Sequence, residues 1–412
     1  MDKLIRFFAI GVLICTPISV WFALSEYLRI SYILLLLAFV SDVIYSLSHH
    51  ESKLIVFQSN TQRQRFLLVC FIGIIVISFV VNSVWHPQPK LMSNFIGTLG
   101  IFFLLYFYYS SLAEKYLSVV LCFKYLAVSC VLLIGIIVVD SVLVNFFGIK
   151  IHDYFCIGYN GNTDYFPRFI WTSTAAPTEE PGVSAQFLNA LLPFALCHFK
   201  GRKRALVCLG YAYCLFSLFS TTGIVTFVFI AMVHVFLFSR RSVKLFLLVF
   251  IISLAGFVAV SYQANDEFQM YVNQIGIIDK VAFSGKTASD ADRSEGMKLA
   301  VDNAMEAPLW GMGPGYGKAI RETGYLSTFL GFMGNYGFLG GFLFILFWIT
   351  FLQKIKKMPD IPEKRALLAS FLAVTVAACI GDCLHMFMLW FLLPIINKSY
   401  NHSLQCGKLS VA

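Results

Sequence analysis

Residues 66–85 read FLLVCFIGIIVISFVVNSVW, a run of 20 residues without a charged side chain. A helix rises about 1.5 Å per residue, so about 20 apolar residues cross roughly 30 Å of hydrocarbon. Similar runs recur along the chain and are continuous rather than alternating, which excludes a membrane β-barrel. Of the 412 residues, 58% are hydrophobic and only 13% are charged, too few charges to coat a soluble protein of this length. The sequence therefore predicts an all-α polytopic membrane protein.

We expect one integral membrane domain over residues 1–412, with about twelve transmembrane helices. They are predicted at approximately 4–24, 30–48, 66–85, 94–111, 118–145, 184–199, 205–220, 223–239, 245–262, 326–352, 366–381 and 383–397. The first is not interpreted as a cleaved signal peptide, because it is long and has no small-residue cleavage site before the next polar stretch.

Lysine and arginine predict the orientation of these helices. With the N-terminus inside, 20 of the 31 lysines and arginines fall in inside segments, against 4 in the short outside loops. We therefore predict a multi-pass protein of the bacterial inner membrane with both termini in the cytoplasm. The net charge of +9 is explained by basic residues beside anionic membrane lipid, and no nucleic-acid partner is needed. Cys156 is the one cysteine placed outside, so no disulfide framework is expected.

Two outside segments, 149–183 and 263–324, are too long to be simple turns and are predicted to be functional loops. The first is rich in aromatic residues from Tyr154 to Trp171, and Arg168 is its only lysine or arginine after Lys150.

The first loop ends in Glu179-Glu180-Pro181-Gly182, directly before a predicted span. Carboxylates at a helix N-terminus are stabilised by the helix dipole, so capping alone explains Glu179 and Glu180. The functional alternative is a carboxylate, held at the membrane boundary, that orients or deprotonates a polar substrate.

Within the second loop, residues 293–306 are predicted to form an amphipathic helix. Its apolar residues recur at the helical spacing of a single stripe, namely Met297, Ala300, Val301, Ala304 and Met305. Arg293 heads this apolar face, where an anion is a natural partner of a guanidinium. An ion pair with a nearby carboxylate such as Asp290 is the structural alternative.

The glycine-rich run Gly311-Met312-Gly313-Pro314-Gly315-Tyr316-Gly317 follows this helix. It does not follow a strand as a dinucleotide-binding loop does. The pattern favours a tight turn that steers the chain into the next span over a phosphate-binding loop.

Ionisable residues inside the spans, such as Asp42, Asp140 and His234, lie near span ends and form no chain across the bilayer. This is evidence against a proton-driven pump. No His or Cys cluster has metal-ligand spacing, so no metal is expected.

Three segments together resemble bacterial O-antigen polymerases of the Wzy type. Arg168 with Glu180-Pro181-Gly182 resembles their "R … EP" loop, and Ser220-Thr221-Thr222-Gly223 resembles their serine-rich turn between two helices. The stretch from Arg293 through Pro308-Leu309-Trp310-Gly311-Met312-Gly313 to Gly337-Phe338-Leu339-Gly340 resembles the "R … P-x-x-G-x-G … G-x-x-G" pattern that these polymerases share with O-antigen ligases. The resemblance covers about residues 165–345.

The resemblance implies a glycosyltransferase C-like fold and a metal-independent enzyme without a cofactor. Such an enzyme joins oligosaccharide repeat units carried on undecaprenyl diphosphate into O-antigen or a related surface polysaccharide, at the periplasmic face of the membrane. An acceptor hydroxyl attacks the anomeric carbon, and the lipid diphosphate leaves. A chain-length regulator is an optional protein partner.

The resemblance also implies the site residues. Arg168 and Arg293, with Arg321 third, are expected to bind the diphosphate and to stabilise charge on its bridging oxygen. Glu180 is expected to orient or activate the hydroxyl, so that Glu180, Arg293 and Arg168 form the catalytic set. Tyr165 and Trp171 are expected to stack on sugar faces or to anchor the loop at the interface.

The sequence departs from the family pattern at two positions. In the ligases a His-Asn/Ser pair precedes the G-x-x-G at a fixed spacing, which here falls on Leu326 and Ser327, and no histidine occurs between His234 and His385. A polymerase is therefore favoured over a ligase. The serine-rich turn continues into Gly223 where many family members have an arginine.

A lipid-linked oligosaccharide flippase or another transporter is the alternative from a different class. Such a protein lines a mid-membrane cavity with charged residues, and these spans hold few.

Overall fold

The computed structural model of this chain describes residues 2–18, 29–49, 62–151, 154, 167–168, 171–174, 177–178, 180–242, 244, 253, 288–321, 323–384 and 386–409. Apart from one hairpin of two-residue strands, the regular structure of this part is helical, with α-helices and two π-helical stretches. The prediction of an all-α membrane protein is confirmed.

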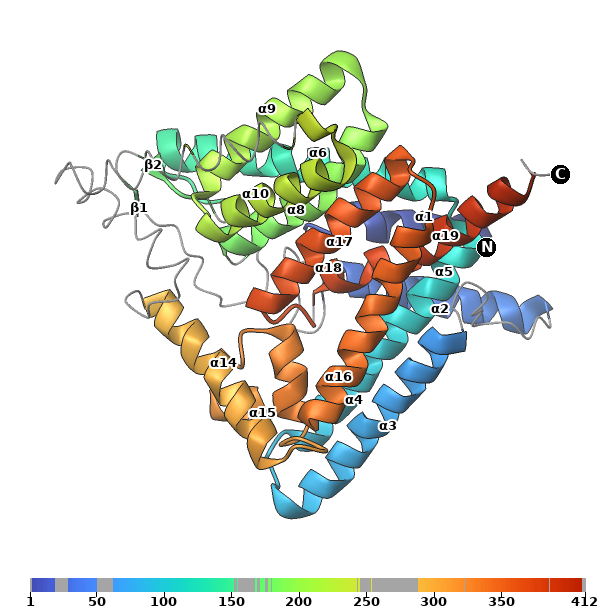
Figure 1. The fold of residues 1–412 in the computed structure, drawn as a ribbon, viewed down its shortest axis with the longest axis vertical. Coiled ribbons are helices and arrows are strands. Elements are labelled where there is room, and N and C mark those ends of the chain that lie inside the picture. The colour runs from blue at the N-terminus through green and yellow to red at the C-terminus, as the bar shows by residue number, and fades with distance from the viewer. Residues whose placement is uncertain are drawn as a thin grey trace.

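Figure 1 shows the helices in two groups. In one, α8 (Pro181–His198) is the central helix and packs against α6, α9, α10 and α17. In the other, α16 packs against α3 and α14. The bounds of the remaining elements are α1 Asp2–Ile14, α2 Ile30–His49, α3 Gln62–Trp85, α4 Leu91–Ile101, η1 Phe102–Tyr108, α5 Tyr109–Tyr116, α6 Val119–Val142, η2 Leu143–Phe147, β1 Pro167–Arg168, β2 Trp171–Thr172, α9 Gly201–Leu218, α10 Thr221–Phe238, α14 Ala288–Glu306, α15 Tyr316–Ile320, α16 Thr328–Lys357, α17 Pro362–Ile380, α18 Phe387–Trp390 and α19 Leu392–Leu409.

Most of the predicted spans coincide with helices. Within the described residues, six helical segments are long and apolar enough to cross a membrane: Ile30–Ser48, Gln62–Trp85, Leu91–Tyr116, Val119–Phe147, Thr221–Phe238 and Thr328–Lys357. The first predicted span, 4–24, is not one continuous helix, because α1 ends at Ile14, three residues before Pro17, which cannot continue the backbone ladder. The predicted span 245–262 lies outside the described residues except for Ser253.

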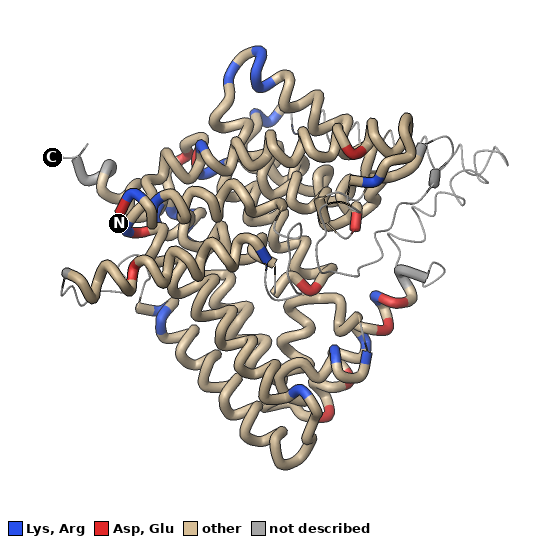
Figure 2. The backbone as a smooth tube through the Cα atoms, turned by 180° about the vertical axis from the view of Figure 1, so that it is seen from behind, with Lys and Arg blue, Asp and Glu red and all other residues tan. Residues whose placement is uncertain are grey.

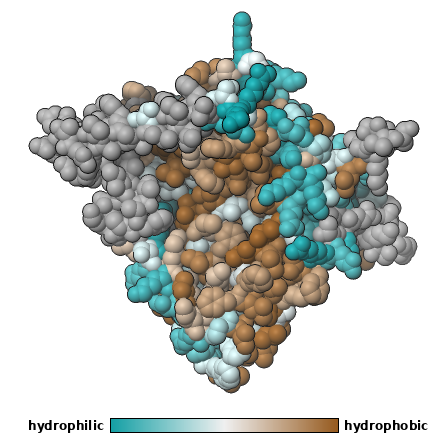
Figure 3. Space-filling view, viewed as in Figure 1, coloured by the Kyte–Doolittle hydropathy of each residue, from teal (hydrophilic) through white to brown (hydrophobic). Residues whose placement is uncertain are grey.

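The surface agrees with a membrane protein. In Figure 2 the charged residues gather near helix ends and loops, and long stretches of tube between them carry no charge. Figure 3 shows hydrophobic side chains across the middle of one face. The two termini lie together on one side of the molecule, and β1, β2 and α14 lie on the opposite side, which we call the loop side (Figure 1).

Helix α16 is a hairpin of two helical segments that meet at Gly337, whose backbone is non-helical (φ 73°, ψ 176°). The Phe329 ring lies 5.8 Å from that of Phe344 and 6.0 Å from that of Trp348. A straight helix would separate Phe329 from Trp348 by about 28 Å, so residues 328–336 double back along the following segment. The predicted span 326–352 is thus a helical hairpin rather than one straight crossing.

Small residues let the two arms of this hairpin pack closely. A Cβ atom at Gly340 would lie 2.5 Å from the Cβ of Tyr336, and one at Gly341 would lie 2.3 Å from Cγ of Met333. The G-x-x-G sequence therefore has two structural roles, since Gly337 reverses the chain and Gly340 receives the returning arm.

The glycine-rich run supplies the hydrogen bonds that the reversal leaves open. The Met312 N–H donates to the Gly334 carbonyl and the Gly313 N–H to the Asn335 carbonyl, both at 3.0 Å, and the Phe338 N–H donates to the Pro308 carbonyl at 2.8 Å. These are the backbone groups that helix ends leave without partners. The run is a turn, as predicted, and its Gly311, Gly313 and Gly315 all have positive φ.

Helix α14 begins at Ala288, earlier than predicted, and its buried face overlaps the predicted stripe at Ala300 and Ala304 but is rotated away from the rest of it. Its inward face is Gly296, Ala300, Asn303 and Ala304, whereas two members of the predicted stripe, Val301 and Met305, are exposed. The small side chains bring α14 close to α16 and Tyr325, and this close approach rather than hydrophobicity selects the inward face.

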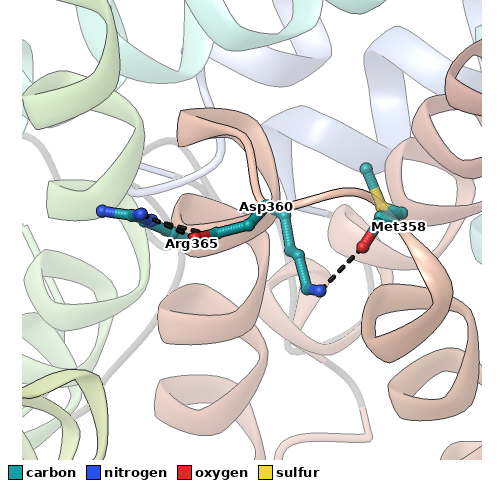
Figure 4. Close-up of polar contacts among 4 residues, drawn as sticks. Met358, Asp360 and Arg365 are labelled. Atoms are coloured by element: carbon teal, nitrogen blue, oxygen red, sulfur yellow. Dashed lines mark hydrogen bonds and ion pairs between the residues drawn. The ribbon is translucent and has the colours of Figure 1, made fainter. Parts of the chain in front are cut away.

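Polar side chains tie helices together away from the loop side. Buried Asp42 of α2 forms an ion pair of 3.4 Å with Lys115 and accepts a hydrogen bond of 3.3 Å from Tyr116. Arg365, in the first turn of α17, donates to both carboxylate oxygens of Asp360 in the turn after α16, at 2.9 and 2.7 Å (Figure 4). The guanidinium also lies 4.9 Å from the ring centre of Phe238 at the end of α10, and it holds the pKa of Asp360 below its ordinary value.

Replacing Gly337 by alanine is expected to destabilise the protein by about 2 kcal/mol or more, because this backbone conformation is almost restricted to glycine. The added Cβ would also lie 2.6 Å from the Pro308 carbonyl oxygen. The measurement is the thermal unfolding midpoint of the purified protein in detergent. Gly135→Ala on α6 is the control, since no described atom lies within 4 Å of that Cβ position. Equal midpoints for the two variants would contradict the role of Gly337.

Candidate functional site

The β1–β2 hairpin carries two of the predicted site residues, Arg168 and Trp171, as directly paired positions. The hairpin is fixed to the ends of neighbouring helices through its backbone. The Thr172 N–H donates to Asn145 Oδ1 at 2.7 Å, and the Thr174 N–H donates to the Ser217 carbonyl at 3.3 Å. The side chains of Arg168 and Trp171, and all of Tyr165, lie outside the described part of the structure.

Glu180 is exposed at the N-cap of α8, with Pro181 in the first turn. Its carbonyl accepts hydrogen bonds from Thr178 Oγ1 at 2.7 Å and from the N–H groups of Val183 and Ser184. No side-chain capping bond is made by Glu180 itself. Its carboxylate therefore does not serve as the cap that the sequence alone allowed, although it does have contacts of its own.

The serine-rich turn lies beside the start of α8. Ser220 caps α10 by accepting a hydrogen bond of 3.1 Å from the Gly223 N–H, and its hydroxyl lies 3.7 Å from where a Cβ of Gly182 would be. Gly223 is required here, because a Cβ would lie 2.3 Å from that of Ala185. The structure thus brings together the Glu180 and Ser220 motifs, which are 40 residues apart in the sequence.

Arg293 and Arg321 belong to a second group of residues, on α14 and just after α15. Arg321 pairs through Nη2 with Asp292 and lies 3.6 Å from Glu295. Its Nη1 packs over Gly296 and, among the described residues, has no hydrogen-bond partner. Arg293 is half-buried one residue further along α14 from Asp292, and no ion pair of Arg293 is recorded within the described part. Arg321 therefore holds α14 in place through its ion pairs, and Arg293 is the one of the two arginines without an ion pair to a described residue.

A polar cleft lies between α4, the segment from Gly315 to Ser327, the first arm of α16 and the turn after α17. It holds about 70 Å³ of space reachable by water. Its polar lining comprises Ser93, Asn94, Thr98, Lys318, Tyr325, Ser327, Thr328, Asn335, Tyr336 and Asp382. Its two charged side chains, Lys318 and Asp382, are of opposite sign.

Tyr325 forms one wall of the cleft and is held in a nest of glycines. Cβ atoms at Gly317 and Gly334 would lie 2.6 and 2.7 Å from its ring. Its hydroxyl accepts a hydrogen bond of 2.8 Å from Asn303 of α14, and burial raises the pKa of the phenol. Tyr325 thus links α14, α15 and the first arm of α16.

The deep end of the cleft is a polar joint between α16 and α17. The Thr328 N–H and Oγ1 both donate to the Gly381 carbonyl, at 3.0 and 2.9 Å, and the Cys383 N–H donates to Thr328 Oγ1 at 2.7 Å. Asp382 Oδ1 accepts a hydrogen bond of 3.2 Å from the Leu384 N–H, which fixes the carboxylate at this end of the cleft.

Leu326, the position where the resemblance expects a ligase histidine, lies between the cleft residues Tyr325 and Ser327. Its backbone is left-handed (φ 55°), one of two such non-glycine residues in the described part. Left-handed backbone is unfavourable for a leucine, and strain of this kind clusters at functional sites.

Sequence reasoning missed the cleft residues Asn335 and Asp382. Asn335 Oδ1 is buried without a hydrogen-bond partner among the described residues, so it is an acceptor available to a ligand. Asp382 follows a predicted span and looks like an ordinary turn residue in the sequence. The fold brings Asp382 into the same cleft as Thr328, and this proximity cannot be read from the sequence. In the described part, no three side chains of His, Cys, Asp or Glu are grouped to hold a metal ion.

Comparison with known families gives one match. A family model described as O-antigen ligase matches residues 206–345, from α9 into the second arm of α16. The matched region contains the Ser220 turn, α14, the glycine-rich run and the Gly337 reversal, but not the hairpin or Glu180. No curated protein matches the chain.

Removing either side of the Arg321–Asp292 pair is expected to loosen α14. Arg321→Ala and Asp292→Ala should each lower stability by about 1 kcal/mol or less, since the pair is partly exposed to solvent. The double variant should be no less stable than the worse single one. Thermal unfolding midpoints of the four proteins test this. Independent, fully additive losses would show that the two side chains do not act together.

Proposed function

We propose that the chain belongs to the O-antigen polymerase and ligase superfamily, since the family model matches residues 206–345, and that it is a polysaccharide polymerase. It joins undecaprenyl-diphosphate-linked oligosaccharide repeat units into O-antigen or a related surface polysaccharide. The family supports glycosyl transfer on a lipid-linked glycan in general. The choice of polymerase is our own inference.

The observation that carries this choice is position 326. The family pattern expects a histidine at the edge of the cleft in a ligase, and this chain has Leu326 there in a left-handed backbone. The cleft therefore takes its acceptor with neutral hydrogen-bonding groups, such as Asn335 and Tyr325, and with Asp382.

The proposed reaction is an inverting or retaining displacement at the anomeric carbon of one lipid-linked glycan. A hydroxyl of the other glycan forms the new C–O bond, its proton passes to a carboxylate, and the C–O bond to the diphosphate breaks. Glu180 is our candidate for the carboxylate because it is exposed at the start of α8. Arg168 and Arg293 are proposed to stabilise the charge that develops on the leaving diphosphate, with Arg321 holding α14 in place. Tyr165 and Trp171 are proposed to contact sugar.

We further propose that the loop side is periplasmic and both termini are cytoplasmic, in the bacterial inner membrane. The common side of the two termini in Figure 1 supports an even number of crossings, as in the twelve-span prediction. No metal or cofactor enters the proposed reaction, and a chain-length regulator would be an additional partner.

The second candidate is an O-antigen ligase, which the description of the matching family favours. The two functions differ in the acceptor, which is a second lipid-linked glycan for a polymerase and lipid A-core for a ligase.

Deleting the gene is expected to leave single repeat units on the lipopolysaccharide, and the wild-type gene should restore the ladder of longer chains on a gel. Arg168→Ala, Arg293→Ala and Glu180→Gln should each fail to restore it. Arg365→Ala, in the first turn of α17, is the matched control and should restore it.

A deletion strain with no repeat units at all would support a ligase or a flippase instead. A ladder that survives the deletion, or full-length glycan from both arginine variants, would overturn the polymerase proposal.

Asp382→Asn tests the cleft separately. An asparagine keeps the oxygen that accepts from the Leu384 N–H, so stability should change little while the charge is lost. We expect shorter chains or none, with wild-type protein levels by immunoblot. Thr375→Val, which removes a hydroxyl that accepts from Trp348 outside the cleft, is the control for a polar change in α17. Normal chain length with Asp382→Asn would remove this carboxylate from the site.

A further inference from the structure

An apolar groove of about 320 Å³ lies between α2 and the α4–η1 helix. Tyr32, Leu36 and Phe39 line it from α2, and Gly100, Phe103 and Leu104 line it from the other side. Leu36 and Phe103 are 43% and 40% exposed, so the groove opens to the surface of the described part. It follows α4 over residues 97–105, a length of about 12 Å.

Two glycines form the floor of this groove, and no neighbouring described side chain requires a glycine at either position. No described atom lies within 4 Å of where Cβ atoms of Gly97 and Gly100 would be. Glycine in the middle of a helix weakens it relative to alanine. Gly340 and Gly341 receive a neighbouring side chain, whereas Gly73 and Gly135 have open space beside them as Gly97 and Gly100 do. Gly97 and Gly100 lie one turn apart and both line the groove. The space above Gly97 and Gly100 is thus not filled by any residue that the structure describes.

The lower end of the groove is closed by aromatic contacts and irregular backbone. Phe39 makes edge-to-face contacts with Phe103 at 5.7 Å and Tyr108 at 5.1 Å. All of η1, from Phe102 to Tyr108, is π-helical, a conformation found mostly at functional sites. The groove therefore ends within the apolar part of the bundle.

The upper end of the groove joins the polar cleft. Gly97 lines both spaces, with Ser93 and Asn94 one turn above it on the cleft side. Arg29, which directly precedes α2, is buried, 6% exposed, and lines neither space. The two spaces meet at Gly97, so a path from one to the other passes from polar groups to apolar side chains. The larger hollow beside Pro308 and Phe342 shares no lining residue with the cleft.

We propose that this groove holds the first isoprene units of the polyprenyl diphosphate carrier, with the diphosphate at the junction near Gly97 and the sugar in the cleft. The identity of the lipid in this inference rests on the proposed function. A molecule with a polar head, an anionic linker and a long apolar tail matches the order of surfaces along the path. Ordinary phospholipid and a second protein are the competing occupants.

The test uses the full-length protein in phospholipid nanodiscs, with p-benzoylphenylalanine in place of Phe103 and radiolabelled undecaprenyl diphosphate as the probe. Val139→p-benzoylphenylalanine, at an exposed position of α6, is the matched control. We expect a labelled adduct at position 103 and not at 139, lost on competition with unlabelled undecaprenyl diphosphate but not with phosphatidylglycerol. Equal labelling at both positions, an adduct with phospholipid alone, or an adduct with protein would overturn the proposal.

Filling the groove provides the second arm. Gly100→Leu and Leu36→Trp should each reduce the adduct at position 103 roughly tenfold, and Gly135→Leu, on open surface of α6, should leave it unchanged. Leu36→Trp covers the case in which Gly100→Leu fails to fold, since Leu36 is exposed. Undiminished labelling in a folded filled variant would also overturn the proposal.

The two proposals fail in different ways. If the ladder is lost on deletion but position 103 takes no probe, the groove assignment is wrong and the polymerase proposal stands. If the probe is taken up but the ladder survives deletion, the groove binds polyprenyl diphosphate and the polymerase proposal is wrong.

Discussion

The structure depends on the chain reversal at Gly337 and on the backbone hydrogen bonds that make it tolerable. A helix broken within an apolar bundle exposes carbonyl and N–H groups that water cannot reach, each costing on the order of 1–3 kcal/mol. Here the backbone of Pro308 to Gly313 pairs with these groups. Ser78 and Asn82 of α3 add bonds of 3.0 Å to the Asn335 and Gly311 carbonyls. The two parts of the motif, Pro308–Gly313 and Gly334–Phe338, are thus separate in sequence but supply one another's backbone hydrogen-bond partners.

The cleft is a consequence of this reversal. Because residues 328–336 turn back into the bundle, Thr328 meets Gly381 at the end of α17, and the first arm presents Asn335 and Tyr336 towards α4. A straight α16 would carry Thr328 away from α17 and leave no polar wall. The same α4 that faces the cleft carries the two unfilled glycines of the apolar groove. The backbone reversal at Gly337 therefore places the polar cleft next to the apolar groove.

The sequence predicted the helical class, most helix positions and the turn at Gly311–Gly317, because long apolar runs and glycine clusters have few structural solutions. It did not predict the hairpin in α16, since residues 326–352 are apolar enough on average to be taken for one span and a positive φ at Gly337 leaves no mark on hydropathy. It also oriented α14 by hydrophobicity, which placed Ala300 correctly but Met305 wrongly, because Gly296 and Asn303 face inward through close packing. Asp382 could not be found because its place in the cleft depends on its neighbours Gly381 and Cys383, which bond to Thr328 more than 50 residues away in the sequence.

The distribution of charge suggests why two sets of residues are needed. In the cleft, Lys318 and Asp382 offset each other, so it suits a neutral sugar better than a diphosphate. Arg293 on α14 has no ion pair with another described residue and is therefore the better candidate to bind an anion. In the proposed reaction both sets act at once, with the diphosphate of the donor near Arg293 and the acceptor sugar in the cleft. Arg321, already paired with Asp292, then contributes by keeping α14 in register with the cleft rather than by binding the anion itself.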